Sequence, residues 1–375
     1  MAIYMWREYV PRTFTISWTE KSDMSSWWTY SDDATWLTAG STDFDEFFWY
    51  SWVRLNTSWV ETDEITQSDS WWAGKLDITQ LWTLTSGDNV MIKFPLRWIK
   101  MTKSWSVVTL SITEDPNKDG YQYYAHCTWT LSSPWTPKDQ FYLWAYKWYT
   151  SSSVLKSWSW QMPTSSQTQA TFCTRAKANG SGYNIIWFYQ RQFVNCLYMM
   201  KYGNPNCQSV VWQWNTSPYY SSRLNSWWTN SQTNATYWTS SDTQQSKLFW
   251  LEDRWGNFRE FIWGAYTDWN RKLYTQLSWY SWTLTWWEYT WVNTSYNYNE
   301  LSSIVWDNKA LFYPTATTGN WNYDTYYCDA SYIGINNLLY TGGSWSEWTA
   351  GGIFFQSGTS WSWTDVSIGS RLLYL

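Results

Sequence analysis

Tryptophan stands in this chain at positions where turns usually require glycine. The sequence contains 40 Trp and only 17 Gly, together 57 of its 375 residues. Turn positions often need φ > 0, which Gly adopts freely and a residue with a Cβ adopts at a cost of roughly 1–2 kcal/mol. About twenty Trp held there at ~1 kcal/mol each would exceed the ~5–15 kcal/mol net stability of an ordinary domain. Many Trp nevertheless lie among turn-forming residues, as in Ser26-Trp27-Trp28-Thr29, Thr57-Ser58-Trp59, Lys103-Ser104-Trp105-Ser106 and Asn320-Trp321-Asn322.

This composition predicts a glycine-rich protein in which some of the glycine codons have been translated as tryptophan. Gly alone falls below the usual ~7%, whereas Gly and Trp together reach about 15%. Some bacterial lineages and their phages read UGA as glycine, and a code that reads UGA as Trp would turn such a gene into this sequence. The alternative is a Trp-rich binding protein, but binding aromatics cluster on one face, whereas these Trp extend from Trp6 to Trp363. Trp255, Trp306 and Trp345 are expected to be genuine in either case.

Length and charge indicate how the chain is organised. It is long enough to bury a full core, and we expect an acidic, β-rich attachment region at 1–87 and a second domain at 88–375. Residues 1–87 carry 5 basic and 13 acidic side chains, and the whole chain has a net charge of −5. This balance does not indicate a nucleic-acid-binding surface. The sequence has no apolar run of about 18 residues, so we expect no membrane span.

Cysteine and histidine are too few and too scattered to predict a metal or catalytic centre. The Cys residues show no C-x-x-C spacing, which favours buried free thiols over disulfides or zinc. His126 is the only His and is expected to be a hydrogen-bonding structural residue. The segment 115–120 matches the first half of a calcium loop, but His126 stands at the twelfth position, where Glu is required, so a polar turn is favoured. We therefore expect no cofactor, no metal and no catalytic residue. The five cysteines are Cys127, Cys173, Cys196, Cys207 and Cys328.

The pattern of apolar residues predicts an α+β fold with short strands, long loops and one main helix. That helix is expected at about 186–202, with Asn184 as its N-cap and Gly203 as its stop. Its residues Phe193, Leu197 and Met200 recur with helical spacing and should form one core-facing side. Two strands, at 90–97 and 107–112, are expected to form a hairpin around the turn at 103–106 if position 105 is glycine.

Three segments of residues 88–375 carry motifs in a fixed order. The first, 142–149, becomes YLGAYKGY with glycine at 144 and 148, and it leads into the helix and the segment KYGNPNCQSVVWQW at 201–214. The second is LEDRWGNFREF at 251–261, and the third is GGSWS at 342–346 followed by IGSRL at 368–372. Together they resemble phage and prophage tail proteins with a C-type-lectin-like domain of the formylglycine-generating-enzyme type, the class that includes targets of diversity-generating retroelements.

The resemblance implies a binding protein of the phage virion rather than an enzyme. Enzymes of this fold oxidise a substrate cysteine with reactive cysteines of their own, whereas Cys328 has no partner thiol near it in the sequence. In the family motifs, Trp255 and Trp345 look like core and turn residues, and Glu252, Asp253 and Glu260 look like turn and salt-bridge residues. Alternatives are a purely structural virion or baseplate protein and, less favoured, a formylglycine-generating-type enzyme.

The same resemblance places a receptor-binding surface in the C-terminal loops, which are rich in the Tyr, Asn and Ser that paratopes favour. The expected partners are a host-surface receptor, protein or glycan, and other tail proteins, in a possible homotrimer. The expected location is the phage tail, assembled in the bacterial cytoplasm. The ligand-binding residues carried over by position, about half of which are expected to be exposed, are Tyr332, Asn336, Asn337, Glu347, Thr349, Phe355, Gln356, Ser357 and Thr359.

Overall fold

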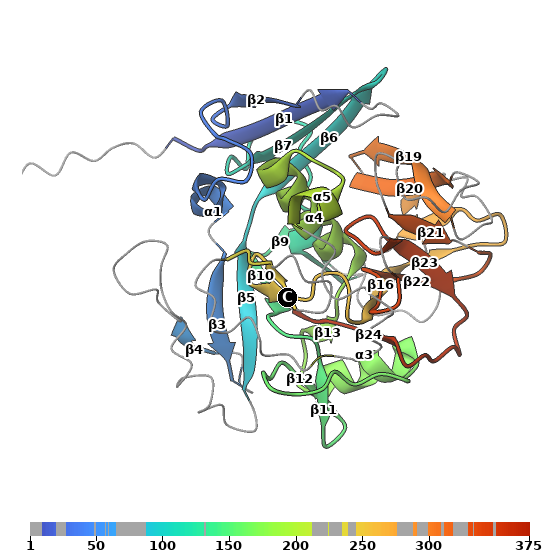
Figure 1. Cartoon of the computed structure of the whole chain (residues 1–375). Coiled ribbons are helices and arrows are strands. Elements are labelled where there is room, and N and C mark those ends of the chain that lie inside the picture. The colour runs from blue at the N-terminus through green and yellow to red at the C-terminus, as the bar shows by residue number, and fades with distance from the viewer. Residues whose placement is uncertain are drawn as a thin grey trace, which may run out of the picture.

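The computed structural model describes residues 10–19, 28–48, 50–56, 58, 60–64, 88–130, 133–211, 224, 235–238, 245–275, 288–290, 299–308, 311–317, 329–332, 334–347 and 350–375. In these residues most of the regular structure is β-sheet, arranged around one long helix (Figure 1). None of the helices in these ranges has the length and apolar character that crossing a membrane requires.

The expected α+β class with a single main helix and a C-type-lectin-like domain is wrong, because the chain is β-rich with several sheets. The described residues contain four α-helices, and a 3₁₀ helix spans Tyr124–His126 (η1). Many strands are short, and several pair with partners far away in the sequence, so local periodicity carries only part of the sheet signal. The four α-helices are Asp43–Phe48 (α1), Gln169–Lys177 (α3), Phe188–Tyr202 (α4) and Cys207–Val211 (α5).

A four-stranded antiparallel sheet has the order β2-β1-β7-β6. Its strands are Thr13–Thr19 (β1), Trp28–Asp32 (β2), Trp98–Ser104 (β6) and Val107–Thr113 (β7). Ser104 pairs with Val107, so residues 105 and 106 form a two-residue loop between β6 and β7. The predicted turn and the strand at 107–112 are therefore confirmed. Most of 90–97 is also a strand, but its expected pairing in the hairpin is wrong, because β6 pairs with β7 and the strand at 89–95 belongs to another sheet.

That second sheet has six strands in the order β13-β25-β10-β5-β3-β4. The strands are Ser51–Leu55 (β3), Glu61–Glu64 (β4), Asn89–Pro95 (β5), Gln140–Trp144 (β10), Tyr183–Ile185 (β13) and Leu372–Tyr374 (β25). The C-terminal strand β25 lies between β10 and β13. Because β1 pairs with β7 and β3 pairs with β5, strands from before and after residue 88 share two sheets.

The nine-stranded sheet is built from the C-terminal part of the chain. Its main path is β18-β17-β16-β22-β23-β21-β19-β20, and Ile368–Gly369 (β24) pairs in parallel with β16. The strands of this path are Arg259–Thr267 (β16), Leu273–Thr275 (β17), Glu288–Thr290 (β18), Asn299–Asp307 (β19), Leu311–Thr317 (β20), Ala330–Tyr332 (β21), Leu338–Thr341 (β22) and Gln356–Thr359 (β23).

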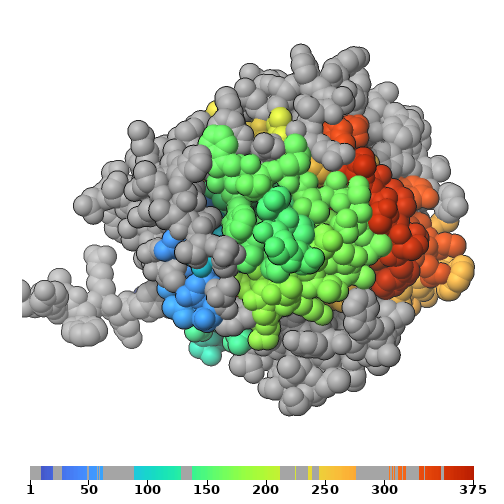
Figure 2. All heavy atoms as spheres, turned by 90° about the horizontal axis from the view of Figure 1, so that it is seen from below, coloured from blue at the N-terminus to red at the C-terminus, as the bar shows by residue number. Residues whose placement is uncertain are grey.

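Three two-stranded units complete the described strands. They are Cys127–Thr130 (β8) with Ser133–Pro137 (β9), Tyr149–Ser151 (β11) with Val154–Lys156 (β12), and Lys247–Leu248 (β14) with Leu251–Glu252 (β15). Near α3, the backbone N–H of Ser166 donates to the carbonyl of Asp365 at 2.9 Å. Figure 2 shows the green residues around α3 and the red C-terminal segment side by side on this face.

Helix α4 lies at the centre of the molecule and contacts β1, β16 and β20 (Figure 1). Its end at Gly203 is confirmed, since Gly203 has φ 61° and its N–H donates to the carbonyl of Met199. Its start differs from the prediction, because the N-cap is Trp187, whereas Asn184 lies in β13 and pairs with Leu373 of β25. All fifteen residues from Phe188 to Tyr202 are buried, so sheets cover the helix on every side rather than on one.

The interior contains two clusters of buried apolar side chains. One surrounds α4 and includes residues of the four-stranded sheet, such as Ile16 and Leu110. The other joins α3, through Phe172, to Phe261 and Tyr340 of the nine-stranded sheet. Cys127, Cys173 and Cys196 are buried free thiols, as the sequence predicts. Cys207 is buried too, and Cys328 lies outside the described residues.

Candidate functional site

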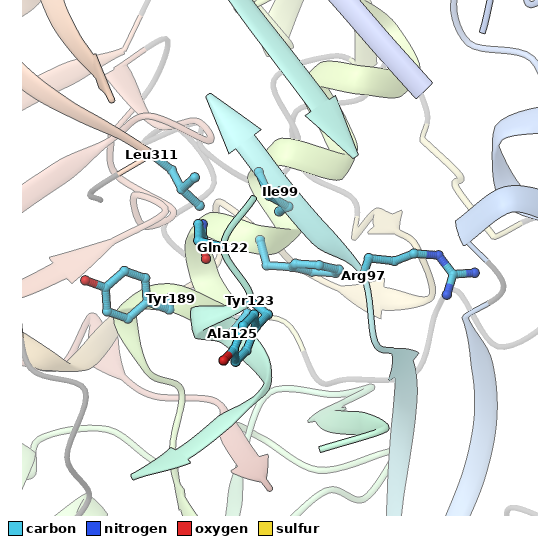
Figure 3. A pocket seen from close by; sticks show the side chains of 8 residues that line it. Arg97, Ile99, Gln122, Tyr123, Ala125, Tyr189 and Leu311 are labelled. Atoms are coloured by element: carbon cyan, nitrogen blue, oxygen red, sulfur yellow. The ribbon is translucent and has the colours of Figure 1, made fainter. Parts of the chain in front are cut away.

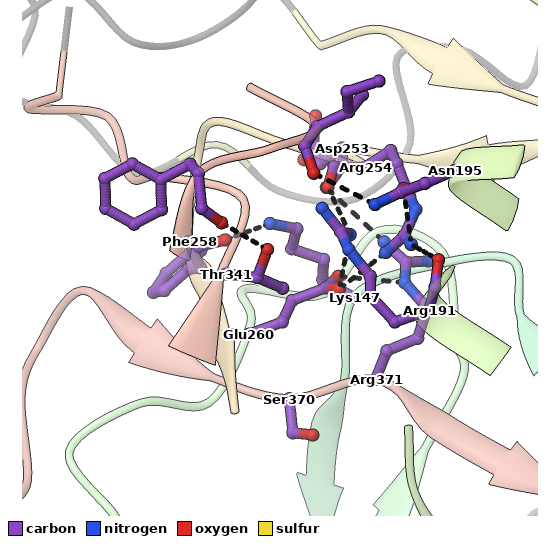
Figure 4. Close-up of polar contacts among 12 residues, drawn as sticks. Lys147, Arg191, Asn195, Asp253, Arg254, Phe258, Glu260, Thr341, Ser370 and Arg371 are labelled. Atoms are coloured by element: carbon purple, nitrogen blue, oxygen red, sulfur yellow. Dashed lines mark hydrogen bonds and ion pairs between the residues drawn. The ribbon is translucent and has the colours of Figure 1, made fainter. Parts of the chain in front are cut away.

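Glu260 forms the centre of a buried ion cluster (Figure 4). Its side chain on β16 is fully buried, as are those of three arginines around it. Arg371 Nε donates to Oε1 of Glu260 at 2.9 Å, and Arg254 Nη1 donates to Oε2 at 3.3 Å. Arg191 Nη1, from α4, lies 3.6 Å from Oε2. One carboxylate therefore joins α4, β16 and the segment that leads into the C-terminal strand.

Backbone carbonyls accept hydrogen bonds from the positively charged groups of the cluster. Lys147 Nζ donates to the carbonyls of Gly256 and Phe258, and Arg371 Nη2 donates to that of Glu252 at 2.6 Å. Burial lowers the pKa of Lys147 to about 8, although Glu260 and Asp253 act in the opposite direction. Removing one member of such a cluster is strongly destabilising, because it leaves the remaining charges buried without compensation.

The three motif segments of the sequence meet at this cluster. Gly256 N–H donates to the carbonyl of Gly342 at 2.8 Å, and Trp345 N–H donates to that of Asn257 at 3.2 Å. Lys147 and Arg371 come from the first and third segments. Trp255 is fully buried, in keeping with the structural role expected for it. The cluster has no solvent-facing group among these residues, so it supports the fold rather than offering a reactive site.

A small crevice beside α4 does not resemble a substrate pocket (Figure 3). It encloses about 170 Å³ and is lined by residues such as Ile99, Gln122, Tyr189 and Leu311. Ligand pockets usually measure ~300–1,000 Å³ and bring several polar groups together. This crevice is therefore too small to bind a typical metabolite.

The residues considered for metal binding do not come together as a metal-binding site in the described part of the chain. The described residues contain no cluster of three or more His, Cys, Asp or Glu side chains that could hold a metal ion. In the segment 115–120, Asn117 N–H donates to Oδ1 of Asp115, as in a polar turn. His126 is fully buried between Phe141 and Phe193, and neither ring nitrogen has a hydrogen-bond partner among the described residues. The expected hydrogen-bonding role of His126 is therefore wrong.

Four of the nine expected ligand-binding residues lie partly exposed near one end of the nine-stranded sheet. They are Tyr332 in β21, Asn336 and Asn337 in the loop before β22, and Thr359 at the end of β23. Thr349 lies outside the described residues.

The other four are buried, in agreement with the expectation that only about half of the set is exposed. Gln356 and Ser357 lie in β23, an inner strand between β21 and β22, and Phe355 directly precedes that strand. Glu347 is buried in an ion pair with Arg259. The residue types of this segment are typical of an exposed binding surface, but β23 has a paired strand on each side and most of its side chains are buried.

Thr359, one of the partly exposed residues, belongs to a row of paired residues that crosses four strands. Tyr274 pairs with Tyr266, Tyr266 with Leu338, and Leu338 with Thr359. Directly paired residues point to the same side of a sheet, so these side chains share one face. The rings of Tyr266 and Tyr274 stack with centroids 5.0 Å apart. We call Tyr266, Tyr274 and Thr359, with Asp268 and Asn336 at their edge, the Tyr266 surface.

Asp268 organises the edge of the Tyr266 surface. Its Oδ1 accepts from the N–H groups of Asn270 and Lys272 at 2.7 and 2.8 Å, which holds the turn between β16 and β17. Its Oδ2 accepts from the Tyr274 hydroxyl at 3.2 Å, and its carbonyl accepts from Asn336 N–H at 3.1 Å. One residue thus connects the turn, the tyrosine pair and the loop before β22.

Sequence reasoning missed Tyr266, Asp268 and Tyr274, which lie about sixty residues or more before the predicted loops. The alternation of Tyr and Thr around an Asp-containing turn was a local signal for a hairpin with one polar face. Burial, with smaller effects of Tyr274 and Asp268, raises the pKa of Tyr266 to about 12. Its hydroxyl is therefore protonated at neutral pH and can donate a hydrogen bond.

Comparison with known proteins identifies no family for the chain. No protein-family model matches it, and no curated protein matches it in sequence.

Proposed function

We propose that this chain is a receptor-binding protein of a phage or prophage tail, which contacts a host-surface ligand through the Tyr266 surface without catalysing a reaction. The observation that carries the proposal is the stacked, half-exposed pair Tyr266 and Tyr274 beside the Asn336 loop. The tail assignment comes from the motif resemblance, and the binding role from the surface.

The chemistry of the surface suits recognition. Stacked tyrosines offer a broad apolar area with a hydroxyl at its rim and lose little conformational freedom on binding. Asn336, Thr359 and Asp268 supply hydrogen-bonding groups around that area. This combination suits a sugar or a polar peptide segment of a surface receptor, which presents both apolar faces and hydroxyl or amide groups.

Rigidity of the surface also supports a binding role. Thr267 N–H donates to the carbonyl of Asn337 at 2.9 Å, and Thr267 Oγ1 donates to that of Gly334 at the same distance. With the bond from Asn336 to Asp268, they fasten the loop to β16. A loop that is ordered before binding loses less entropy when the ligand arrives. In this proposal the acidic region 1–87 attaches the protein to the tail, and its location is the virion.

Binding of the purified full-length chain to host cells tests the proposal. We expect the double variant Tyr266→Ala, Tyr274→Ala to bind at least about tenfold more weakly, because two large contact side chains are lost. Tyr149→Ala, a half-buried tyrosine on β11, is the matched control and should bind normally. Thermal unfolding of each variant shows whether the fold is kept.

Each outcome decides between named roles. Equal binding by the folded double variant and the parent chain would contradict the site. No binding by the parent chain would contradict the receptor-binding role and favour a structural virion protein.

A further inference from the structure

Trp105 occupies the position of a tight hairpin that glycine normally fills. It is the first residue of the two-residue loop between β6 and β7, where its φ is 56° and its side chain is 96% exposed. Two-residue hairpin loops with φ > 0 only at this first position strongly favour Gly there. A bulky residue in the left-handed region is rare, and here the indole gains no burial in return.

Trp250 lies in a second two-residue hairpin loop. Leu248 pairs with Leu251, and the loop residues Phe249 and Trp250 have φ values of 51° and 65°. A loop with both central residues at φ > 0 is the type that prefers Asn-Gly or Gly-Gly. Two consecutive aromatic residues in this conformation are therefore strained.

Trp160 is the third tryptophan with a left-handed backbone, at φ 67° in the turn after β12. The residues that the sequence indicates to be true tryptophans have a different backbone conformation. Trp255 and Trp306 are absent from the positive-φ residues. Both are buried, as is Trp250, whose ring lies 5.5 Å from that of Trp52, so backbone conformation rather than burial separates the two groups. The ring of Trp306 lies 5.1 Å from that of Trp18 and 6.0 Å from that of Phe354.

We infer that the functional protein carries glycine at positions 105, 160 and 250 and retains tryptophan at 255 and 306. Backbone conformation thus divides these five residues, which the sequence writes with one letter, into two classes. The three with positive φ correspond to UGA codons that the source organism reads as glycine, and the other two correspond to ordinary tryptophan codons. The inference does not involve the Tyr266 surface, whose defining residues include no tryptophan.

Peptide mass spectrometry of the protein from its native source tests the inference directly. Trypsin releases residues 104–118, 248–254 and 255–259, each of which contains a single position in question: 105, 250 or 255. We expect the first two peptides to be lighter by the difference between Trp and Gly, and the third to have the mass of Trp. Fragment ions of the peptide 157–175 locate the change at 160 rather than 158. Tryptophan at 105, 160 and 250 would overturn the inference.

Stability of the recombinant chain provides a second test. We expect Trp105→Gly to raise the midpoint of thermal unfolding by about 1–3 °C, since it relieves the backbone and exposes no core. Trp306→Gly should lower the midpoint by at least about 5 °C or abolish folding, because it opens a large cavity. A lower midpoint for Trp105→Gly, or an unchanged one for Trp306→Gly, would contradict the assignment.

Discussion

Arg371 Nε donates to Oε1 of Glu260 at 2.9 Å across 111 residues of sequence, inside an interior where both side chains are fully buried. The contact fixes the segment before the last strand to β16. With Arg191 and Arg254 it gives one carboxylate three guanidinium partners.

Removing the Glu260 charge should therefore destabilise the fold strongly. We expect Glu260→Gln to lower the free energy of unfolding by about 3–5 kcal/mol, because it leaves buried cations without their shared anion. Urea denaturation measures this. Glu46→Gln, at an exposed position of α1, is the control and should change it by less than about 0.5 kcal/mol. A loss below about 1 kcal/mol at Glu260 would show that the cluster contributes little.

Gly264 should tolerate no larger side chain. It has φ 75° in β16, where the register with β22 shifts, and an added Cβ would lie 1.7 Å from Nε1 of Trp187. We expect Gly264→Ala to lower the free energy of unfolding by at least about 3 kcal/mol. Gly40→Ala is the matched control. Gly40 has φ 82°, but its nearest contact would be an ordinary 3.5 Å, so its cost should be about 1 kcal/mol. Equal decreases in the free energy of unfolding for the two variants would contradict the explanation by a clash with Trp187.

His126 should make the fold sensitive to acid. Burial, and then the charge of Arg97, lowers its pKa well below 6.5. Below pH 6.5 His126 therefore binds a proton in the unfolded chain but not in the folded chain, and the free energy of unfolding decreases as the pH falls. We expect His126→Phe to remove this component in urea denaturation between pH 7 and about 5.5.

The raised pKa values of Asp45 and Asp253 act in the opposite direction, so the difference between parent and variant isolates His126. Parallel pH profiles would show that His126 does not titrate in this way.

Lys147 should make stability rise with pH above neutrality. Burial lowers its pKa from 10.5 to about 8, so between these values the unfolded chain binds more protons than the folded chain. The free energy of unfolding then increases with pH by up to about 3 kcal/mol over this window, since one pKa unit corresponds to about 1.4 kcal/mol. Lys247, whose pKa burial lowers to about 7, contributes to the slope in the same direction, so we expect Lys147→Met to make the profile between pH 8 and 10 less steep without flattening it. A profile as steep as that of the parent would assign the slope to another group.

Local sequence determined the features that depend on adjacent residues. The stop of α4 at Gly203 and the turn at 103–106 follow from backbone preferences within a few positions. The tertiary structure decided which strands are neighbours. It buried Phe355, Gln356 and Ser357 inside a sheet and brought Tyr266 and Tyr274 beside the Asn336 loop. These pairings join segments far apart in the chain, and their register depends on contacts that no single segment contains. The sequence already placed Trp105 in a turn and set Trp306 apart, and the folded backbone added the left-handed conformation of Trp105 and the burial of Trp306 in the core.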